Sequence, residues 1–355
     1  MSTELDIQAF KCFESISLEL EKLTVLCGPN SGGKSSIVQA LLLHSYATAA
    51  STDQIPVNGP FGLQLGDAES LQNRASHSEA EEGFSITFDG QAITYVPEVS
   101  PRVLKTIRTG RSNVRPTIFL SAERNGPRLS QEAFSNQSDE NLNVGYAGQF
   151  TAEVLVTRER EHVREALRPG EVDSLILLGP VVEHYLSLIF GPIQVQARAN
   201  GNTPPSLYFK RPGVEEDWSL AAHTGFGITY VLPVIVAGLL AAEGSTFVVD
   251  SPEAHLHPAA QTELAKFLVR LAGSGVTVVV ETHSDYVIEG VRIAVAAQGL
   301  LPTKDCVIYS IELTEEGIRS ATALMIESDG KISDWPKGFF DQHVINMRSL
   351  LVKKE

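Results

Sequence analysis

The stretch Gly28-Pro29-Asn30-Ser31-Gly32-Gly33-Lys34-Ser35 decides the fold of this chain. It fits the pattern of a glycine, four residues and then Gly-Lys-Ser, in which backbone N–H groups curl around phosphate oxygens. The apolar residues 23–27 before it predict a buried strand, and residues 36–43 after it predict a helix. A helix that begins at such a loop adds a field that favours phosphate. The sequence therefore predicts a nucleotide site, in preference to a glycine-rich turn that binds nothing.

The residue types in this loop predict ATP and Mg²⁺ as cofactors. Lys34 is expected to reach the β- and γ-phosphates, and the Ser35 hydroxyl is expected to hold Mg²⁺. The residues expected to contact the nucleotide are Asn30, Ser31, Gly32, Gly33, Lys34, Ser35 and Ser36.

Two further predicted strands end in polar residues. Asp250 follows the apolar run 246–249 and is expected to hold Mg²⁺ through water, and Glu253 is placed to orient an attacking water. His283 follows strand 276–281 and is expected to hydrogen-bond a γ-phosphate. The plainer alternatives are a strand that ends in a helix-capping Asp and a histidine that is only structural. His255 and His257 lack a third ligand at a telling distance, so we expect no zinc site.

The composition limits the class of protein. With 355 residues, of which 43% are hydrophobic, the chain can form one domain with insertions, or two domains. Its three cysteines stand singly, which suits a reducing compartment. The N-terminus has no signal-peptide pattern, and the most apolar stretch, residues 228–242, is too short to span a bilayer and predicts a buried helix. We therefore expect a cytoplasmic protein.

The net charge of −15 argues against non-specific coating of nucleic acid, but a local basic surface remains open. Basic residues recur at intervals of three or four, which predicts that a helix would stack several of them on one side. These residues are Arg102, Lys105, Arg108, Arg111 and Arg115. They form either a solvated helix face or a contact surface for nucleic acid or an acidic partner.

The order of predicted segments indicates an α/β fold. Strands are expected at residues 5–10, 16–20, 23–27, 84–88, 92–96, 117–121, 193–199, 206–210, 246–250, 276–281 and 307–312. Helices are expected at residues 36–43, 150–190, 259–271 and 285–297. Continuous apolar strands that alternate with helices in the second half imply a parallel sheet that is covered on both faces.

Taken together, these segments resemble the ATP-binding-cassette (ABC) ATPases, and specifically the soluble OLD-like branch (overcoming lysogenisation defect). The stretches that carry the resemblance are residues 10–13, 28–36, 120–127, 225–233, 250–258, 281–285 and 334–341. The resemblance implies an ABC-type P-loop fold with a mostly parallel central sheet, an N-terminal antiparallel β subdomain and a helical insertion. It divides a single ATPase domain, 1–355, into a β and P-loop lobe (1–128), a mainly helical insertion (129–222) and a lobe that carries the signature, the acidic strand and the switch histidine (223–355).

The resemblance also implies a mechanism. Two protomers would sandwich two ATPs, and Gly225 and Gly227 of the signature segment would face the partner's γ-phosphate. Glu123 and Arg124 lie where the family couples the nucleotide to partner contacts, and His283 matches its switch histidine. Two departures matter: Ser251 stands where transporter ATPases have the catalytic Glu, and the signature lacks the transporter form. Either Glu253 is then the base, or hydrolysis is slow and ATP acts mainly as a clamp.

The predicted function is an ATP-hydrolysing homodimer that controls a separately encoded nuclease or toxin, with antiphage defence as the expected setting. Too few residues follow Asp285 for the Toprim nuclease domain of full OLD proteins. The alternatives are a RecF-like DNA repair ATPase, with the basic stripe from Arg102 to Arg128 as its DNA face, and a non-hydrolysing ATP-dependent scaffold. We expect the aromatic cluster at 335–340 to pack the C-terminal segment onto the domain.

Overall fold

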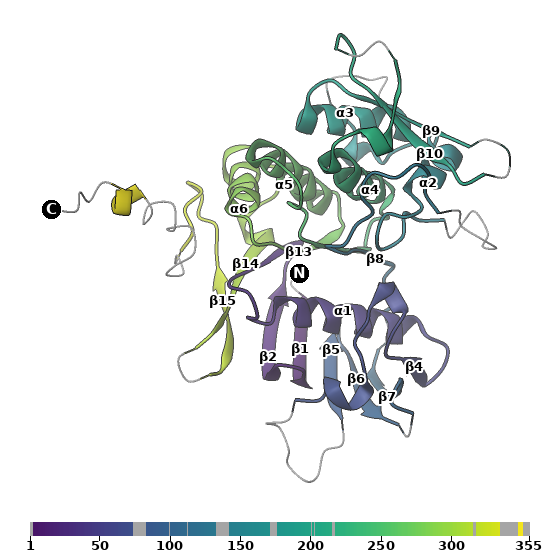
Figure 1. Cartoon of the computed structure of the whole chain (residues 1–355). Helices are drawn as coiled ribbons and strands as arrows, with labels where there is room; N and C mark the ends of the chain where they lie inside the picture. The colour runs from purple at the N-terminus through teal and green to yellow at the C-terminus, as the bar shows by residue number, and fades with distance from the viewer. Residues whose placement is uncertain are drawn as a thin grey trace.

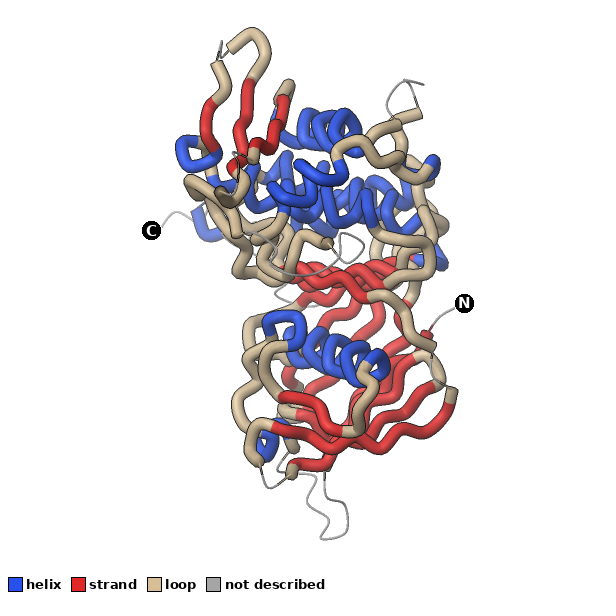
Figure 2. The backbone as a smooth tube through the Cα atoms, turned by 90° about the vertical axis from the view of Figure 1, so that its right-hand side faces the viewer, coloured by secondary structure: helices blue, strands red, loops and turns tan. Residues whose placement is uncertain are grey.

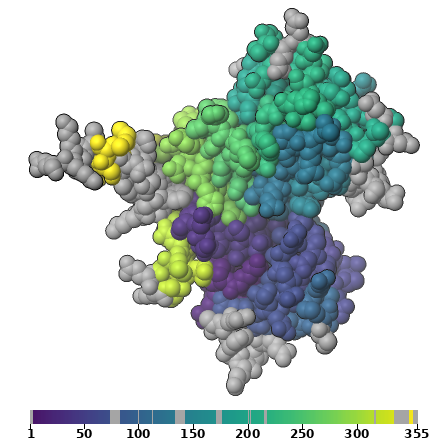
Figure 3. Space-filling view, viewed as in Figure 1, coloured from purple at the N-terminus to yellow at the C-terminus, as the bar shows by residue number. Residues whose placement is uncertain are grey.

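The computed structural model describes residues 3–73, 83–98, 100–111, 113–132, 142–170, 176–199, 201, 203–214, 217–314, 317–333 and 347–350. These residues form two six-stranded sheets, one three-stranded sheet and the helices that pack around them. Figure 1 shows the N-terminal sheet in one lobe, and the central sheet with most of the helices above it. The space-filling view shows the same two lobes (Figure 3).

The central sheet has the strand order β15-β14-β3-β13-β12-β8, and every neighbouring pair except β14 and β15 is parallel. Its strands are β3 (Leu23–Cys27), β8 (Thr117–Leu120), β12 (Thr246–Asp250), β13 (Thr277–Glu281), β14 (Cys306–Leu313) and β15 (Arg319–Leu324). The predicted α/β fold with a mostly parallel central sheet is confirmed.

Alternate side chains of the central strands enter two different cores. Val248 and Val279 belong to the core that contains the buried face of α1 (Lys34–Ala49), whereas Val249 and Val280 belong to the core of the other helices. This two-sided burial explains why β12 and β13 are apolar at successive positions. It also places the side chains of the strand ends, because residues two apart share a face.

The second large sheet is antiparallel, with the order β2-β1-β5-β6-β7-β4. Its strands are β1 (Thr3–Phe10), β2 (Phe13–Leu20), β4 (Gln54–Pro56), β5 (Phe84–Phe88), β6 (Gln91–Pro97) and β7 (Val103–Gly110). Helix α1 lies between this sheet and the central one (Figure 2), and it contacts β1 and β5 on one side and β8 and β13 on the other. The predicted N-terminal antiparallel subdomain is therefore present.

Most of the remaining helices cover the opposite face of the central sheet. Helices α4 (Phe226–Leu240) and α5 (Pro258–Gly273) contact β8 and β13, respectively. Helix α3 (Leu178–Phe190) packs on α4 and α5, and α6 (Asp285–Arg292) packs on α5 and continues as a π-helical turn, η7 (Ile293–Ala297). Helix α4, expected as a buried helix, has buried side chains along most of its length. None of the helices in the described ranges is both long and apolar enough to cross a membrane.

The segment between β8 and α4 contains helices and strands. It comprises α2 (Thr151–Arg158), α3 and a three-stranded antiparallel sheet of β9 (Gln194–Arg198), β10 (Ser206–Lys210) and β11 (Ser219–Leu220). A continuous helix over residues 150–190 was a wrong prediction, because α2 ends at Arg158 and α3 begins at Leu178.

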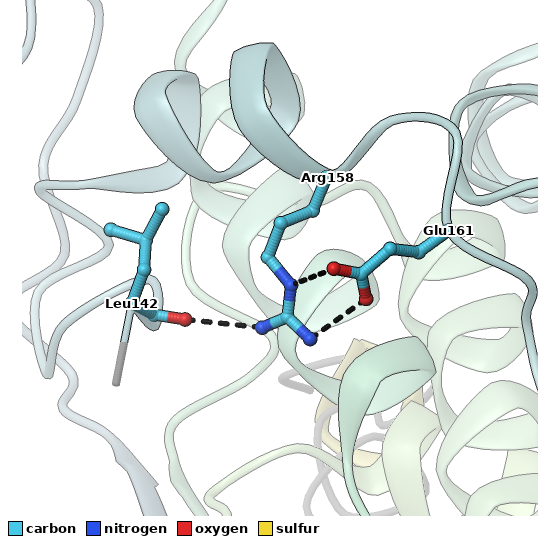
Figure 4. A network of polar contacts seen from close by, with 3 residues as sticks. All are labelled: Leu142, Arg158 and Glu161. Carbon is cyan, nitrogen blue, oxygen red and sulfur yellow. Dashed lines mark hydrogen bonds and ion pairs between the residues drawn. The ribbon is translucent and has the colours of Figure 1, made fainter. Parts of the chain in front are cut away.

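An ion pair fixes the end of α2. The Arg158 guanidinium donates to both carboxylate oxygens of Glu161 at 2.8 Å and to the Leu142 carbonyl at 3.1 Å (Figure 4). Glu161 N also donates to the Arg158 carbonyl. The oppositely charged side chains that suggested a longer helix therefore lie in the turn that ends α2.

The predicted basic helix at residues 102–115 is also wrong, because residues 103–110 form β7. In that strand the buried Leu104 and Thr106 alternate with the exposed Lys105 and Ile107. The β-branched residues of the segment favour this two-residue period over a helical one.

The strand separates the basic side chains. Lys105 and Arg108 lie on opposite faces of β7, because they are an odd number of residues apart. Arg108 donates to the Thr52 carbonyl, and Arg115 pairs with Asp89 at 2.9 Å, while Arg102 and Arg111 are exposed. The aromatic cluster at 335–340 lies outside the described residues.

Candidate functional site

The predicted phosphate loop runs from the end of β3 to the start of α1, and backbone geometry fixes its glycines. Gly28 and Gly33 have φ values of +123° and +117°, which side-chain-bearing residues rarely adopt. A Cβ atom on Gly28 would lie 2.4 Å from the Ile311 carbonyl oxygen, and one on Gly32 would lie 2.6 Å from it. The loop therefore packs closely against the backbone of β14.

Lys34, the first residue of α1, points back into this loop. Its ammonium donates to the carbonyls of Gly28 and Pro29, both at 2.9 Å, and the residue is only 3% exposed. Burial lowers the pKa of Lys34, while the carboxylate of Glu281 raises it. The cation is thus held where phosphates would lie inside the loop.

The loop residues line a cavity of about 340 Å³. It is lined by Cys12, Asn30, Ser31, Gly33, Lys34, Ser35, Ser36, Glu281 and His283. Six of the seven residues predicted to contact the nucleotide therefore line one cavity, and Gly32 lies in the loop behind it. Cys12 was not predicted as a site residue, and Glu281 was noted only within the polar stretch 281–285, with no role of its own.

Glu281 ends β13 in register with Asp250 at the end of β12. Asp250 comes two residues after Val248, and Glu281 comes two residues after Val279. Because residues two apart in a strand share a face, both side chains lie on the α1 side of the sheet. Glu281 accepts a hydrogen bond from the Ser35 hydroxyl at 2.8 Å. Burial, reinforced by the charge of Asp250, raises the pKa of Glu281 to about 7.

Asp250 and Ser251 form the turn after β12. The Ser251 hydroxyl donates to Asp250 Oδ1 at 2.8 Å, and Ser251 has a positive φ of 47°. Ser251 N also donates to the Glu281 carbonyl at 2.8 Å, which ties this turn to β13. The Ser251 hydroxyl therefore helps to orient the carboxylate of Asp250.

Glu253 is held by the segment that carries the predicted switch histidine. One of its carboxylate oxygens accepts from the Thr282 hydroxyl and the other from His283 N, both at 2.8 Å. His283 is exposed in this structure as a whole residue, and partial desolvation of its ring, followed by the nearby Lys34 charge, lowers its pKa. The two predicted catalytic side chains are thus linked through backbone and hydroxyl contacts.

The two glycines of the predicted signature segment, Gly225 and Gly227, lie outside the phosphate-loop cavity. Gly225 caps the exposed start of α4, whereas a Cβ atom on Gly227 would lie 3.0 Å from the His255 carbonyl. Between them Phe226 is 53% exposed and packs against the ring of His255. Neither glycine lines the cavity of the phosphate loop, so the structure does not bring all the predicted nucleotide contacts together within one chain.

The donor atoms near the loop fit Mg²⁺. The Ser35 hydroxyl, Asp250 and Glu281 supply oxygen atoms, which this cation prefers. Oxygen Oε2 of Glu281 is buried and has no hydrogen-bond partner among the described residues. Among the described residues, no group of three or more His, Cys, Asp or Glu side chains could hold a metal ion, so waters and oxygens of a bound nucleotide would complete the coordination of Mg²⁺.

The fold and the loop define the class of protein: this is an ABC-type P-loop ATPase. Residues 23–289 match the family described as "AAA domain, putative AbiEii toxin, Type IV TA system", and the chain belongs to that family. Residues 301–350 match a second family, described as "Protein of unknown function (DUF3696)".

One curated relative is the energy-coupling factor transporter ATP-binding protein EcfA2 of Ureaplasma parvum. It is 26% identical over 168 residues, which are 47% of this chain and 33% of the relative. The chain thus matches about a third of the length of that protein.

Among solved structures, the Smc head domain of Pyrococcus furiosus, with an extended coiled coil and bound to the C-terminal domain of ScpA, shares the fold. Its TM-score is 0.51 at 11% identity, and the match covers 99% of this chain and 100% of the other. The SMC head domain of Thermotoga maritima is similar at a TM-score of 0.43 and 13% identity, covering 90% of this chain and 98% of the other, which is too weak to add to the assignment.

Proposed function

We propose that this chain binds and hydrolyses ATP with Mg²⁺, dimerises around the nucleotide, and controls a separately encoded effector. The observation that carries the proposal is that Glu253 accepts hydrogen bonds from Thr282 and from His283, and that His283 lines the phosphate-loop cavity. A bound Mg²⁺, held by Ser35 and Asp250, would neutralise charge on the β- and γ-phosphates.

Glu253 is the proposed general base. A carboxylate oriented by two donors keeps a fixed position, which suits it to accept a proton from an attacking water. Thr282 and His283 belong to one segment, so a contact between His283 and a γ-phosphate would be transmitted to Glu253 through their hydrogen bond. Lys34 would lie against the same phosphate oxygens.

The proposed dimer places a second signature segment over each cavity. Gly225 and Gly227 lie outside the phosphate-loop cavity of their own chain, and the start of α4 is exposed around Phe226. Backbone N–H groups at the start of this helix could then face the γ-phosphate bound by another protomer.

The family description calls the matched domain itself a putative toxin of a type IV toxin–antitoxin system, which supports a setting in which this chain acts with a separately encoded partner. We propose that this partner is a separately encoded nuclease or toxin, that the setting is antiphage defence in the cytoplasm, and that the chain belongs to the OLD-like branch.

Turnover and mass in solution test the proposal. The wild type, Glu253→Gln and the control Glu289→Gln, which changes an exposed carboxylate on α6, are compared with and without Mg-ATP. We expect turnover in the wild type and the control, and an ATP-bound dimer that accumulates without turnover in Glu253→Gln. A wild type that neither hydrolyses ATP nor changes mass would contradict the proposal.

A second function, an ATP-dependent scaffold, is favoured by one observation. Ser251 cannot act as a carboxylate base, and its hydroxyl is engaged with Asp250. In the same experiment, a wild-type dimer that forms with ATP and shows no turnover would identify the scaffold.

A further inference from the structure

The buried carboxylate of Glu281 is not among the residues predicted to bind the metal, which are Ser35 and Asp250. It is the last residue of β13, it is 3% exposed, and it lies beside Asp250 on the neighbouring strand. A carboxylate this deeply buried is rare unless another group compensates its charge.

One compensating group is the hydroxyl of the phosphate loop. Ser35 Oγ donates to Glu281 Oε1 at 2.8 Å. Asp250, the carboxylate that the sequence predicts for the metal, accepts instead from the Ser251 hydroxyl at 2.8 Å. In the described part of the chain, Glu281 is therefore the carboxylate that fixes the orientation of Ser35.

The other oxygen of Glu281 points to a ligand. Oε2 is buried and has no hydrogen-bond partner among the described residues, although the side chain lines the phosphate-loop cavity. The nearby Lys34 ammonium donates to the carbonyls of Gly28 and Pro29. Leaving a buried polar atom unsatisfied costs about 1–3 kcal/mol, and more for a charged group, so a cation or its bound water is the fitting partner.

We propose that Glu281 is part of the magnesium site: it accepts a hydrogen bond from the Ser35 hydroxyl, which leaves the Ser35 lone pairs for the cation, and its second oxygen contacts the cation or a water bound to it. The inference rests on the proposed binding of Mg-ATP, and it adds a second carboxylate to the predicted pair of Ser35 and Asp250.

The test measures nucleotide binding rather than turnover. A fluorescent ATP analogue is titrated into the full chain in EDTA and then at increasing Mg²⁺. The variants are Glu281→Gln, which keeps the size and an acceptor oxygen but removes the charge, and Glu281→Asp, which keeps the charge on a shorter side chain. Glu289→Gln is the matched surface control, and thermal unfolding of each variant confirms that it is folded.

We expect Glu281→Gln to bind the analogue in EDTA within about twofold of the wild type, and to need at least about tenfold more Mg²⁺ for the half-maximal gain in affinity. Glu281→Asp should lie between the two. Electron paramagnetic resonance of Mn²⁺, used in place of Mg²⁺, should show weaker retention of the ion by Glu281→Gln in the presence of the analogue.

Two results would overturn the inference, and they distinguish a failure of the metal role of Glu281 from a failure of nucleotide binding. If Glu281→Gln and the wild type require the same Mg²⁺ concentration, Glu281 lies outside the metal site while nucleotide binding stands. If the wild type binds no analogue in EDTA or in Mg²⁺, the proposed function fails and the inference fails with it. Should Glu281→Gln not fold, unchanged Mg²⁺ dependence in Glu281→Asp would count against the inference.

Discussion

The guanidinium of Arg124, in the loop after β8, donates to the backbone carbonyl of Asp250 at the end of β12 at 2.8 Å. The same side chain donates to the carbonyls of Ser121, Tyr230 and Ser251 at 2.7, 3.1 and 2.8 Å. Arg124 therefore joins the loop after β8, the helix that begins at the signature segment, and the turn after β12. Burial lowers its pKa to about 10, which leaves it charged at neutral pH.

Replacement of Arg124 should destabilise this junction. Arg124→Lys is expected to lower the free energy of unfolding by roughly 2–4 kcal/mol, because an ammonium cannot reach four carbonyls that a planar guanidinium satisfies together. Urea unfolding measures the effect. Arg128→Lys, at a site where the side chain is 50% exposed, is the matched control and should change stability by less than about 0.5 kcal/mol. Equal stability of the two variants would show that the four contacts contribute little.

Loss of the Thr282 hydroxyl should slow turnover without weakening nucleotide binding. Thr282→Val removes the donor to Glu253, so the proposed base is less well oriented and turnover should fall by roughly tenfold or more. Thr282→Ser keeps the hydroxyl and should retain most of the activity. Steady-state hydrolysis and the affinity for a fluorescent ATP analogue are measured on the same samples. A Thr282→Val enzyme with wild-type turnover would remove Thr282 from the mechanism.

One thiol should report nucleotide binding. Cys12 lines the phosphate-loop cavity, 3.6 Å from the Ser36 hydroxyl, whereas Cys27 and Cys306 are buried and burial raises the pKa of each to about 12. In the folded protein at pH 8, a thiol reagent such as Ellman's should therefore react fast with one cysteine, and Mg-ATP should slow that reaction.

Cys12→Ser supplies the control for this assignment. It should eliminate the fast phase and leave the slow reaction of the buried thiols unchanged. A fast phase that persists in Cys12→Ser, or one that ignores Mg-ATP, would contradict the placement of this side chain at the nucleotide site.

Acid should destabilise the N-terminal lobe through His44. This residue is 2% exposed, its Nε2–H donates to the Gln91 carbonyl at 3.0 Å, and burial lowers its pKa from 6.5 to about 4. Because the unfolded chain then binds the proton more readily, the stability that His44 provides is complete above about pH 6.5 and is lost as the pH falls towards 4. The loss should approach about 3 kcal/mol.

Unfolding by urea at several pH values measures this loss. His44→Gln keeps a donor for Gln91 and cannot be protonated in this range, so its stability should fall less steeply between pH 6.5 and pH 4 than that of the wild type. His257→Gln, an exposed control, should follow the wild type. Parallel profiles for His44→Gln and the wild type would exclude His44 as the titrating group.

The central strands were predictable because burial on both faces requires successive apolar residues. Val278, Val279 and Val280 face two cores in turn, and that pattern has no helical period. By contrast, β4 and β15 were missed, since three residues at Gln54–Pro56 and the polar run Arg319–Leu324 become strands only by pairing with β7 and β14. A helix was wrongly predicted at residues 102–115 because the basic residues there are three or four positions apart, as on one face of a helix. The buried residues Leu104 and Thr106 are two positions apart, as in a strand.

The candidate site was predictable where the loop geometry depends on residue type. The glycines at 28 and 33 need positive φ, and Lys34 follows them at the start of a helix. Glu281 was missed as a contact of Ser35 because the two are 246 residues apart, although an acid at the end of a valine-rich strand beside Asp250 was a usable signal. The four carbonyl contacts of Arg124 carry no signal in the sequence, since backbone acceptors are present at every residue.

The position of β3 has a consequence for the biogenesis of this protein. Strand β3 ends at Cys27, yet its hydrogen-bonded neighbours are β13 and β14, which end at Glu281 and Leu313. During synthesis, the ribosome must therefore release most of the chain before the centre of the main sheet can close. The antiparallel sheet is complete by Gly110 and can form early, whereas the central strands can pair only after a late, long-range closure.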